Sequence, residues 1–153
     1  MFASQPMYEE ISVVGTGAYG TVYKGIDLKT SRIVAMKRIR IKVTDEGLPI
    51  STVREIAYLR HLEKYDHENI VKLLDVCHGP RLNSEQNIIL IFEYIDYDLD
   101  TYMRRFTSNL SLEKIMDLMK QILVGVDFLH TNRIVHVNKR TFLSLILFSL
   151  FSY

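Results

Sequence analysis

The 153-residue chain has the length of one ordinary domain, and its 48% hydrophobic and 24% charged residues are typical of a folded globular protein rather than a disordered tail. Nineteen basic and eighteen acidic side chains leave a formal net charge of +1, which excludes a strong overall field as a reason to bind nucleic acid or an anionic membrane. A single cysteine, Cys77, excludes an internal disulfide and a cysteine-based zinc site, so we expect a reducing compartment, the cytoplasm and nucleus.

The two ends of the chain do not indicate a membrane protein. The N-terminus shows no basic segment followed by an apolar one, so we expect no signal peptide. The apolar stretch at the other end covers only residues 142–153, whereas a bilayer span needs about 20 apolar residues. A membrane anchor is therefore the weaker interpretation, and an exposed or aggregation-prone tail is the stronger one.

The first part of the chain predicts a small antiparallel sheet. Residues 8–28 read as two strands joined by a glycine-rich turn, and residues 32–41 read as a third strand. Residues 48–65 predict a helix, because Pro49 suits an early helical position and apolar residues recur at helical spacing from Val53 to Leu62. Two further strands at 69–79 and 87–95 complete an α+β unit of five strands and one helix.

Beyond residue 98 the pattern becomes helical. Residues 110–130 place one apolar stripe along a helix, and Ser111 is a suitable N-cap. The stripe consists of Ile115, Leu118, Met119, Ile122, Val126 and Leu129. Because little sequence follows this helix, we expect the stripe to find little to pack against and the chain to be poorly soluble without a partner.

The glycine-rich turn "GTGAYGTV" has several interpretations. It is weak evidence alone, since a glycine-containing hairpin needs no function. A dinucleotide site would require a helix directly after Gly20, but the β-branched and aromatic "TVYKG" follows. A glycine-rich loop between two strands, with a valine two residues after the last glycine, is instead the form that covers nucleotide phosphates.

Two charged residues strengthen the phosphate interpretation. Lys37 lies in "VAMK" on the third predicted strand, where a lysine can reach the phosphates. Glu55 shares a face of the predicted helix with Leu59 and Leu62, so packing of that face on the sheet would direct Glu55 toward Lys37. A lone strand lysine or surface glutamate is ordinarily only solvated, but the three elements in order favour nucleotide binding.

These motifs, together with "PISTVRE", resemble those of the cyclin-dependent protein kinases. "DEGLPISTVREIAYLRHLEKYDHENIVKLLDVC" and "FEYIDYDLDTYM" are most similar to the subgroup that pairs with D-type cyclins. The resemblance covers residues 8–136 and implies a kinase small lobe with its hinge at 1–97, part of a large lobe at 98–136 and a tail of another character at 137–153. It implies an ATP site formed by Val14, Gly15, Gly17, Gly20, Val22, Ala35, Lys37, Glu55, Phe92, Glu93, Ile95 and Asp98.

The resemblance also implies specific roles. The adenine would lie between aliphatic side chains, with Phe92 behind it, the backbone of Glu93 and Ile95 beside it and Asp98 near the ribose. Lys37 would hold the α- and β-phosphates. A cyclin would contact the helix at Pro49, Ile50, Ser51, Thr52, Val53 and Arg54. Tyr19 matches an inhibitory phosphorylation site, whereas Ala18 replaces the neighbouring threonine of many relatives.

After His136 the chain departs from the family pattern. The catalytic loop of the family reads H-R-D-L-K-x-x-N, whereas this chain reads "HVNKRTFL". Asn138 therefore stands at the position of the catalytic aspartate, Leu143 stands at that of the magnesium-binding asparagine, and D-F-G and A-P-E motifs are missing. ATP would bind weakly if at all, the protein ligands for magnesium are absent, and we expect no useful phosphoryl transfer by this chain as written.

Several explanations of this departure stay open. Val137, Asn138 and Lys139 can be encoded by an intron donor sequence, and a tail rich in Phe, Leu, Ile and Ser fits read-through into T-rich sequence. The chain would then be a flawed copy of a Ser/Thr kinase without a role of its own. Alternatively, a chain that stops at the catalytic loop could sequester a cyclin and compete with the intact kinase. A dinucleotide-dependent oxidoreductase is a distant alternative.

Overall fold

The computed structural model describes residues 7–17, 20–42, 48–79, 85–97, 99–106 and 110–134. Contacts divide the chain into two compact units. The first comprises residues 1–65 and 72–94, and the second comprises residues 66–71 and 95–153. The division falls after Tyr94, close to the hinge expected from the sequence, and the short segment 66–71 belongs with the second unit.

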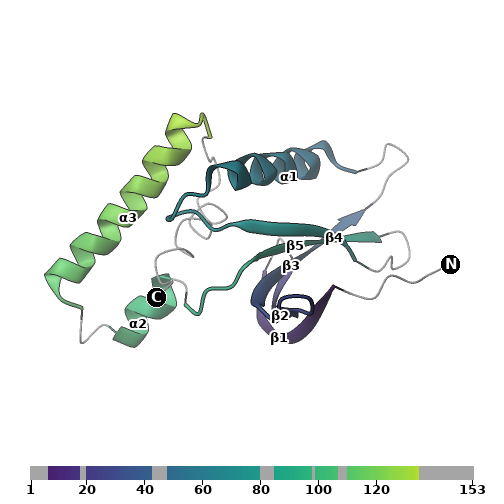
Figure 1. Cartoon of the computed structure of the whole chain (residues 1–153), viewed down its shortest axis with the longest axis horizontal. Coiled ribbons are helices and arrows are strands. Elements are labelled where there is room, and N and C mark those ends of the chain that lie inside the picture. Colours follow the sequence, from purple (N-terminus) through teal and green to yellow (C-terminus); the bar gives the residue numbers. More distant parts are fainter. Residues whose placement is uncertain are drawn as a thin grey trace. The chain divides into compact units, whose positions relative to one another are not determined.

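The first unit is a five-stranded antiparallel sheet, as the sequence predicts (Figure 1). Its strands are β1 (Tyr8–Gly17), β2 (Gly20–Asp27), β3 (Ile33–Lys42), β4 (Leu73–His78) and β5 (Glu85–Glu93). They are ordered β1-β2-β3-β5-β4, and every neighbouring pair is antiparallel. The first three strands therefore form the predicted meander, and β5 separates β4 from β3.

Alternation along the central strands gives the sheet two different faces. Val34 and Met36 of β3 pack with Ile89 and Ile91 of β5 in one buried cluster. Residues of the other parity, such as Lys37, project from the opposite face, because successive strand side chains point to opposite sides. Leu90 lies opposite Lys37 in the β3–β5 register and is 0% exposed. The best-buried leucine of the sheet therefore lies next to Lys37 on the same face.

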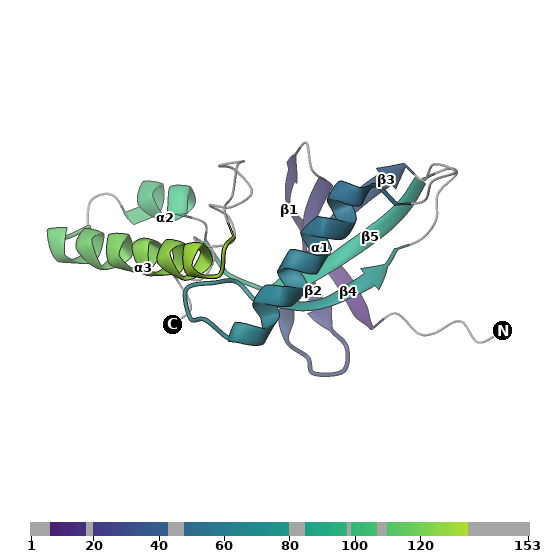
Figure 2. The same ribbon diagram turned by 90° about the horizontal axis from the view of Figure 1, so that it is seen from above.

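One helix, α1 (Ile50–Leu62), lies across the sheet in the first unit and continues into the 3-10 turn η1 (Glu63–Tyr65) (Figure 2). Pro49 precedes the helix with an extended backbone, and its carbonyl accepts hydrogen bonds from the N–H groups of Thr52 and Val53. Proline suits this position because its N–H would have no helical partner there. Leu59 is the buried residue of the helix.

The second unit contains the helices α2 (Leu99–Phe106) and α3 (Leu112–Thr131). Ser111 caps α3 as predicted, since its hydroxyl accepts a hydrogen bond from the Lys114 N–H at 3.2 Å. Leu118 of α3 is buried against the α2 side chains Leu99 and Tyr102. The expected helical character of this region is confirmed.

Only part of the predicted α3 stripe is buried. Leu118 and Leu129 are 3% and 1% exposed, whereas Ile115 and Met119 stay 38% and 51% exposed. The helix thus presents a large apolar surface, in agreement with the expectation that its stripe is only partly packed. No helix in the part of the chain that the structure describes is long and apolar enough to cross a membrane.

Candidate functional site

The strand register brings three of the predicted site positions, Gly15, Val22 and Lys37, into one row that ends at Leu90. Gly15 of β1 pairs with Val22 of β2, Val22 pairs with Lys37 of β3, and Lys37 pairs with Leu90 of β5. Directly opposite residues of antiparallel strands project to the same face of the sheet. Val22 and Lys37 therefore lie on the same face of the sheet, the one that α1 covers, and next to the glycine-rich ends of β1 and β2.

Lys37 is held by a carboxylate from α1. Its Nζ lies 3.7 Å from Oε1 of Glu55, and the two side chains are 21% and 44% exposed. The ion pair that the sequence predicts is therefore present. Because both partners keep contact with water, the pair contributes only about 0–1 kcal/mol to stability. The main effect of the ion pair is to orient Lys37, because it keeps the ammonium group on the side of β3 that faces α1.

The loop glycines differ in their surroundings. A Cβ atom added to Gly15 or Gly17 would meet nothing within 4 Å, so the backbone there borders open space. Gly20 has a φ of +124°, and a Cβ atom there would lie 2.0 Å from the carbonyl oxygen of Arg38. Gly20 also begins β2 rather than a helix, which does not suit the dinucleotide interpretation of the loop.

Replacing Gly20 with alanine is expected to lower the free energy of unfolding by more than about 1 kcal/mol, because alanine strains both the backbone angle and the contact with β3. Gly15→Ala is the matched control, since it adds the same methyl group to open space on the same loop. Urea unfolding followed by circular dichroism measures both variants. Equal stability of the two variants would contradict this account of Gly20.

The predicted adenine side of the site is only partly assembled by the first unit. Ala35 is 7% exposed and pairs with Phe92 across β3 and β5, so these two predicted residues are neighbours. Val14 is 54% exposed at the glycine-rich end of β1. Ile95 is buried but belongs to the second unit. The ATP-binding roles of these residues stay predictions.

Glu93 has a structural role that the sequence did not reveal. Its carboxylate accepts a hydrogen bond from the Lys72 N–H at 2.9 Å, and its own N–H donates to the Lys72 carbonyl at 3.2 Å. The side chain thus joins the end of β5 to the segment that precedes β4. No local pattern signals this contact, because the two residues meet only when the strands pair.

Several predicted residues lie outside the described part of the chain. They are Tyr19, Asp98, and the catalytic-loop positions Asn138 and Leu143. Among the residues that the structure describes, no three His, Cys, Asp or Glu side chains are grouped so that they could hold a metal ion.

The predicted cyclin segment lies at the N-terminal end of α1 and is largely exposed. Ile50 and Val53 are 68% and 48% exposed, although both are aliphatic. Pro49, Ser51 and Arg54 are exposed as well, and Thr52 is half-buried. The helix therefore presents aliphatic side chains to solvent at its start while Glu55, one residue beyond, turns to β3.

A polar cluster at Asp75 of β4 lies apart from the predicted ATP site. Tyr8 donates a hydrogen bond to the Asp75 carboxylate at 3.3 Å, and the Cys77 thiol lies 3.5 Å from the same oxygen. Burial, reinforced by Asp75, raises the pKa of Tyr8 to about 12 and that of Cys77 to about 11. Cys77 therefore stays protonated at neutral pH and is a weak nucleophile.

Comparison with known proteins assigns this arrangement to a family. The model of the protein kinase domain matches residues 8–138. Cyclin-dependent kinase 4 of Xenopus laevis is 51% identical over 130 residues, which cover 84% of this chain and 41% of that protein. The Ovis aries protein of the same name is 48% identical over 133 residues, covering 84% of this chain and 44% of its own length.

A more distant relative shows the same extent of similarity. Cell division control protein 2 homolog 1 of Trypanosoma brucei brucei is 41% identical over 129 residues, which cover 84% of this chain and 40% of that protein. The chain thus spans less than half the length of these curated relatives. The matched region contains the five-stranded sheet, the Lys37–Glu55 ion pair and the helices that follow. The chain belongs to the protein kinase family, and its sequence is that of a cyclin-dependent-kinase-like member.

Proposed function

We propose that this chain binds ATP on the α1 side of its sheet, between the glycine-rich ends of β1 and β2 and the side chain of Lys37. The observation that carries the proposal is the 3.7 Å ion pair between Lys37 and Glu55, in register with Val22 and the glycine-rich strand. An ammonium group oriented in this way attracts phosphate oxygens, and glycines without side chains let backbone N–H groups approach them.

The described residues fit the phosphate part of a nucleotide better than its base. Gly15 and Gly17 border open space, and Lys37 supplies a positive charge. Val22 and Ala35 give the apolar surface that an adenine ring requires. A bound ATP would supply the phosphoryl group, whereas this chain contributes binding and orientation. Residues of the first unit would cover only one side of the adenine ring, so we expect ATP to bind weakly.

Phosphoryl transfer is not part of the proposal. Asn138 stands where the family places its catalytic aspartate, and an amide cannot accept the proton of a substrate hydroxyl. Losing a general base typically costs about 10² to 10⁴ in rate. Leu143, at the position of a magnesium-binding asparagine, has no oxygen ligand to offer. The residues present therefore do not fit a catalytic magnesium site, and no step is assigned to one.

Titration of the purified chain with a fluorescent ATP analogue tests the binding proposal. We expect saturable binding that unlabelled ATP reverses, together with no transfer of radiolabelled phosphate to a basic acceptor protein. Intact cyclin-dependent kinase is the positive control for transfer. Absence of reversible binding would reject the nucleotide site, and labelled acceptor above the level of a heat-inactivated sample would reject the inactive assignment.

A second candidate function is cyclin binding without catalysis. A chain with this function would compete with an intact kinase for the cyclin. The aliphatic residues Ile50 and Val53 favour it, because they are exposed on the first turn of α1. The Xenopus laevis and Ovis aries relatives are cyclin-dependent kinases by name, which supports a cyclin as the partner, and the sequence resemblance to the D-type-cyclin subgroup suggests a cyclin of D type. The proposal requires no residue beyond α1.

Replacing Val53 with aspartate is expected to lower retention of the chain on an immobilised D-type cyclin by about tenfold, because a charge would replace the exposed aliphatic side chain that the cyclin would bury. Leu74→Asp on β4 is the matched control, since Leu74 is 45% exposed and lies outside α1. A pull-down at micromolar concentration measures both variants. No retention of the unmodified chain, or equal loss with both variants, would reject the cyclin-binding function.

A further inference from the structure

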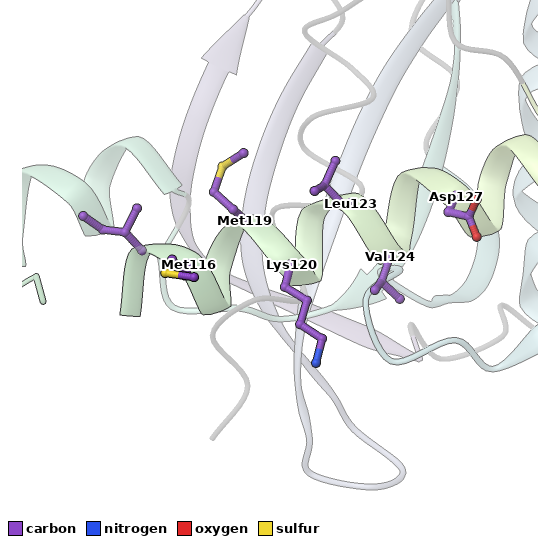
Figure 3. A pocket seen from close by; sticks show the side chains of 7 residues that line it. Met116, Met119, Lys120, Leu123, Val124 and Asp127 are labelled. Carbon is purple, nitrogen blue, oxygen red and sulfur yellow. The ribbon is translucent and has the colours of Figure 1, made fainter. Parts of the chain in front are cut away.

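The outer side of α3 carries an open apolar groove. We call it the α3 groove and define it by the exposed side chains of Ile115, Met116, Met119, Leu123 and Val124, which are 38–64% exposed (Figure 3). Lys120 and Asp127 border it, and its volume is about 580 Å³, enough for several aliphatic side chains. A contiguous apolar surface of this kind marks a place where another segment binds.

We propose that residues 142–151 of the same chain occupy the α3 groove. This segment reads "FLSLILFSLF" and contains no charged residue, so it can cover the groove without burying an unpaired charge. It lies outside the described residues, and the helix it would cover belongs to the same compact unit. Binding of this segment to the α3 groove requires neither nucleotide nor cyclin, so its test is independent of the two proposed functions.

The end of α3 is closed by a defined cap. Arg133 adopts a φ of 58°, the Arg133 N–H donates to the His130 carbonyl at 2.9 Å, and the Ile134 N–H donates to the Leu129 carbonyl at 2.9 Å. This pair of hydrogen bonds is the Schellman motif, in which the chain leaves the helix axis after the last turn. The chain is thus turned away from α3 where the proposed return segment begins.

The connecting residues are long enough for the return. Residues 135–141 can span about 23 Å when extended. Val124 lies seven residues before Thr131, which is about 10 Å along the helix axis. A segment attached through so short a connection is present at an effective concentration on the order of millimolar. That exceeds the concentration of any second copy in a micromolar solution of the protein.

Charges favour the attached segment over a second α3 helix. Lys139 and Arg140 are separated from the apolar run only by Thr141, so they would lie near the C-terminal carbonyls of α3 and near Asp127. By contrast, two antiparallel α3 helices centred on Lys120 would set Lys120 against its own copy and Glu113 against Asp127. Both pairings oppose like charges at the edge of the groove.

Disulfide trapping tests the proposal in the full chain. In a Cys77→Ser background, Met119→Cys combined with Ile146→Cys is expected to form an intramolecular disulfide at least about tenfold faster than Leu112→Cys combined with Ile146→Cys. Leu112 is the matched control, because it is a 74% exposed apolar residue of α3 outside the groove. Equal rates for the two pairs would overturn the proposal. A rate that rises with protein concentration would assign the groove to a second copy instead.

Limited chymotrypsin digestion gives a second readout without engineered cysteines. Met119→Asp is expected to speed cleavage within residues 142–151 by about tenfold, because it places a charge under the docked segment. Leu112→Asp adds the same charge outside the groove and should leave the cleavage rate unchanged. Cleavage of the unmodified chain at the rate of the Met119→Asp variant would also overturn the proposal.

Discussion

Replacing Lys37 with methionine is expected to weaken binding of the fluorescent ATP analogue by about 10- to 100-fold. A hydrogen bond to a charged group contributes about 1.5–3 kcal/mol, and methionine keeps the length of the side chain while removing the charge. The free energy of unfolding should change by less than about 1 kcal/mol, because the Lys37–Glu55 pair is partly exposed. Equilibrium titration measures the first effect, and urea unfolding measures the second.

Two further variants make this result specific. Arg40→Met removes a cation from the same strand but from the opposite face of the sheet, and it should leave nucleotide binding unchanged. Glu55→Gln keeps Lys37 but removes its holding charge, so its effect on binding should be smaller than that of Lys37→Met. Equal weakening by Lys37→Met and Arg40→Met would indicate a general charge effect and would refute the proposed site.

Leu90→Ala is expected to have the largest effect on stability, a loss of about 2–5 kcal/mol in the free energy of unfolding. Leu90 is fully buried between β3 and β4, so alanine leaves a cavity in addition to removing apolar contact. Because a unit of this size has a small core, we expect the variant to be unfolded or close to it at 37 °C. Thermal and urea unfolding followed by circular dichroism measure the loss.

Leu74→Ala provides the comparison for the core variant. Leu74 lies on β4, two residues from Val76, the β4 residue that pairs with Leu90, but it is 45% exposed. Its truncation should cost less than about 1 kcal/mol, as is usual for surface positions. If both leucine variants lost stability equally, burial in the sheet would not explain the role of Leu90, and the described core would be wrong.

The Lys37–Glu55 pair would couple the proposed nucleotide site to the proposed cyclin contact. Glu55 follows directly on the exposed segment that we propose as the cyclin contact, so both lie on α1. A partner that displaces or fixes α1 would change the position of Glu55 and with it the orientation of Lys37. In this arrangement cyclin and nucleotide would influence each other's affinity reciprocally, as linkage requires.

The sequence predicted most of the fold because its elements are signalled locally. Alternation in β3, the proline before α1 and the Ser111 cap each reflect a physical preference of a few adjacent residues. The Lys37–Glu55 pair was also predictable, since helical spacing put Glu55 on the face of Leu59. For α3, the incomplete burial of the apolar stripe was expected, but the periodicity could not tell which of its residues are covered, because it shows only which residues share a face.

By itself, then, the sequence determined the five strands, the helices, the nature of the glycine-rich loop and the candidate site residues, all of which depend on short-range patterns or on motifs of the kinase family. Only the tertiary structure decided that β5 lies between β3 and β4, that Leu90 lies beside Lys37, that Glu93 binds the backbone of Lys72, and that the α3 groove is open. These features depend on contacts between residues far apart in the chain. Such contacts form only when strands pair and helices pack, so no local pattern records them.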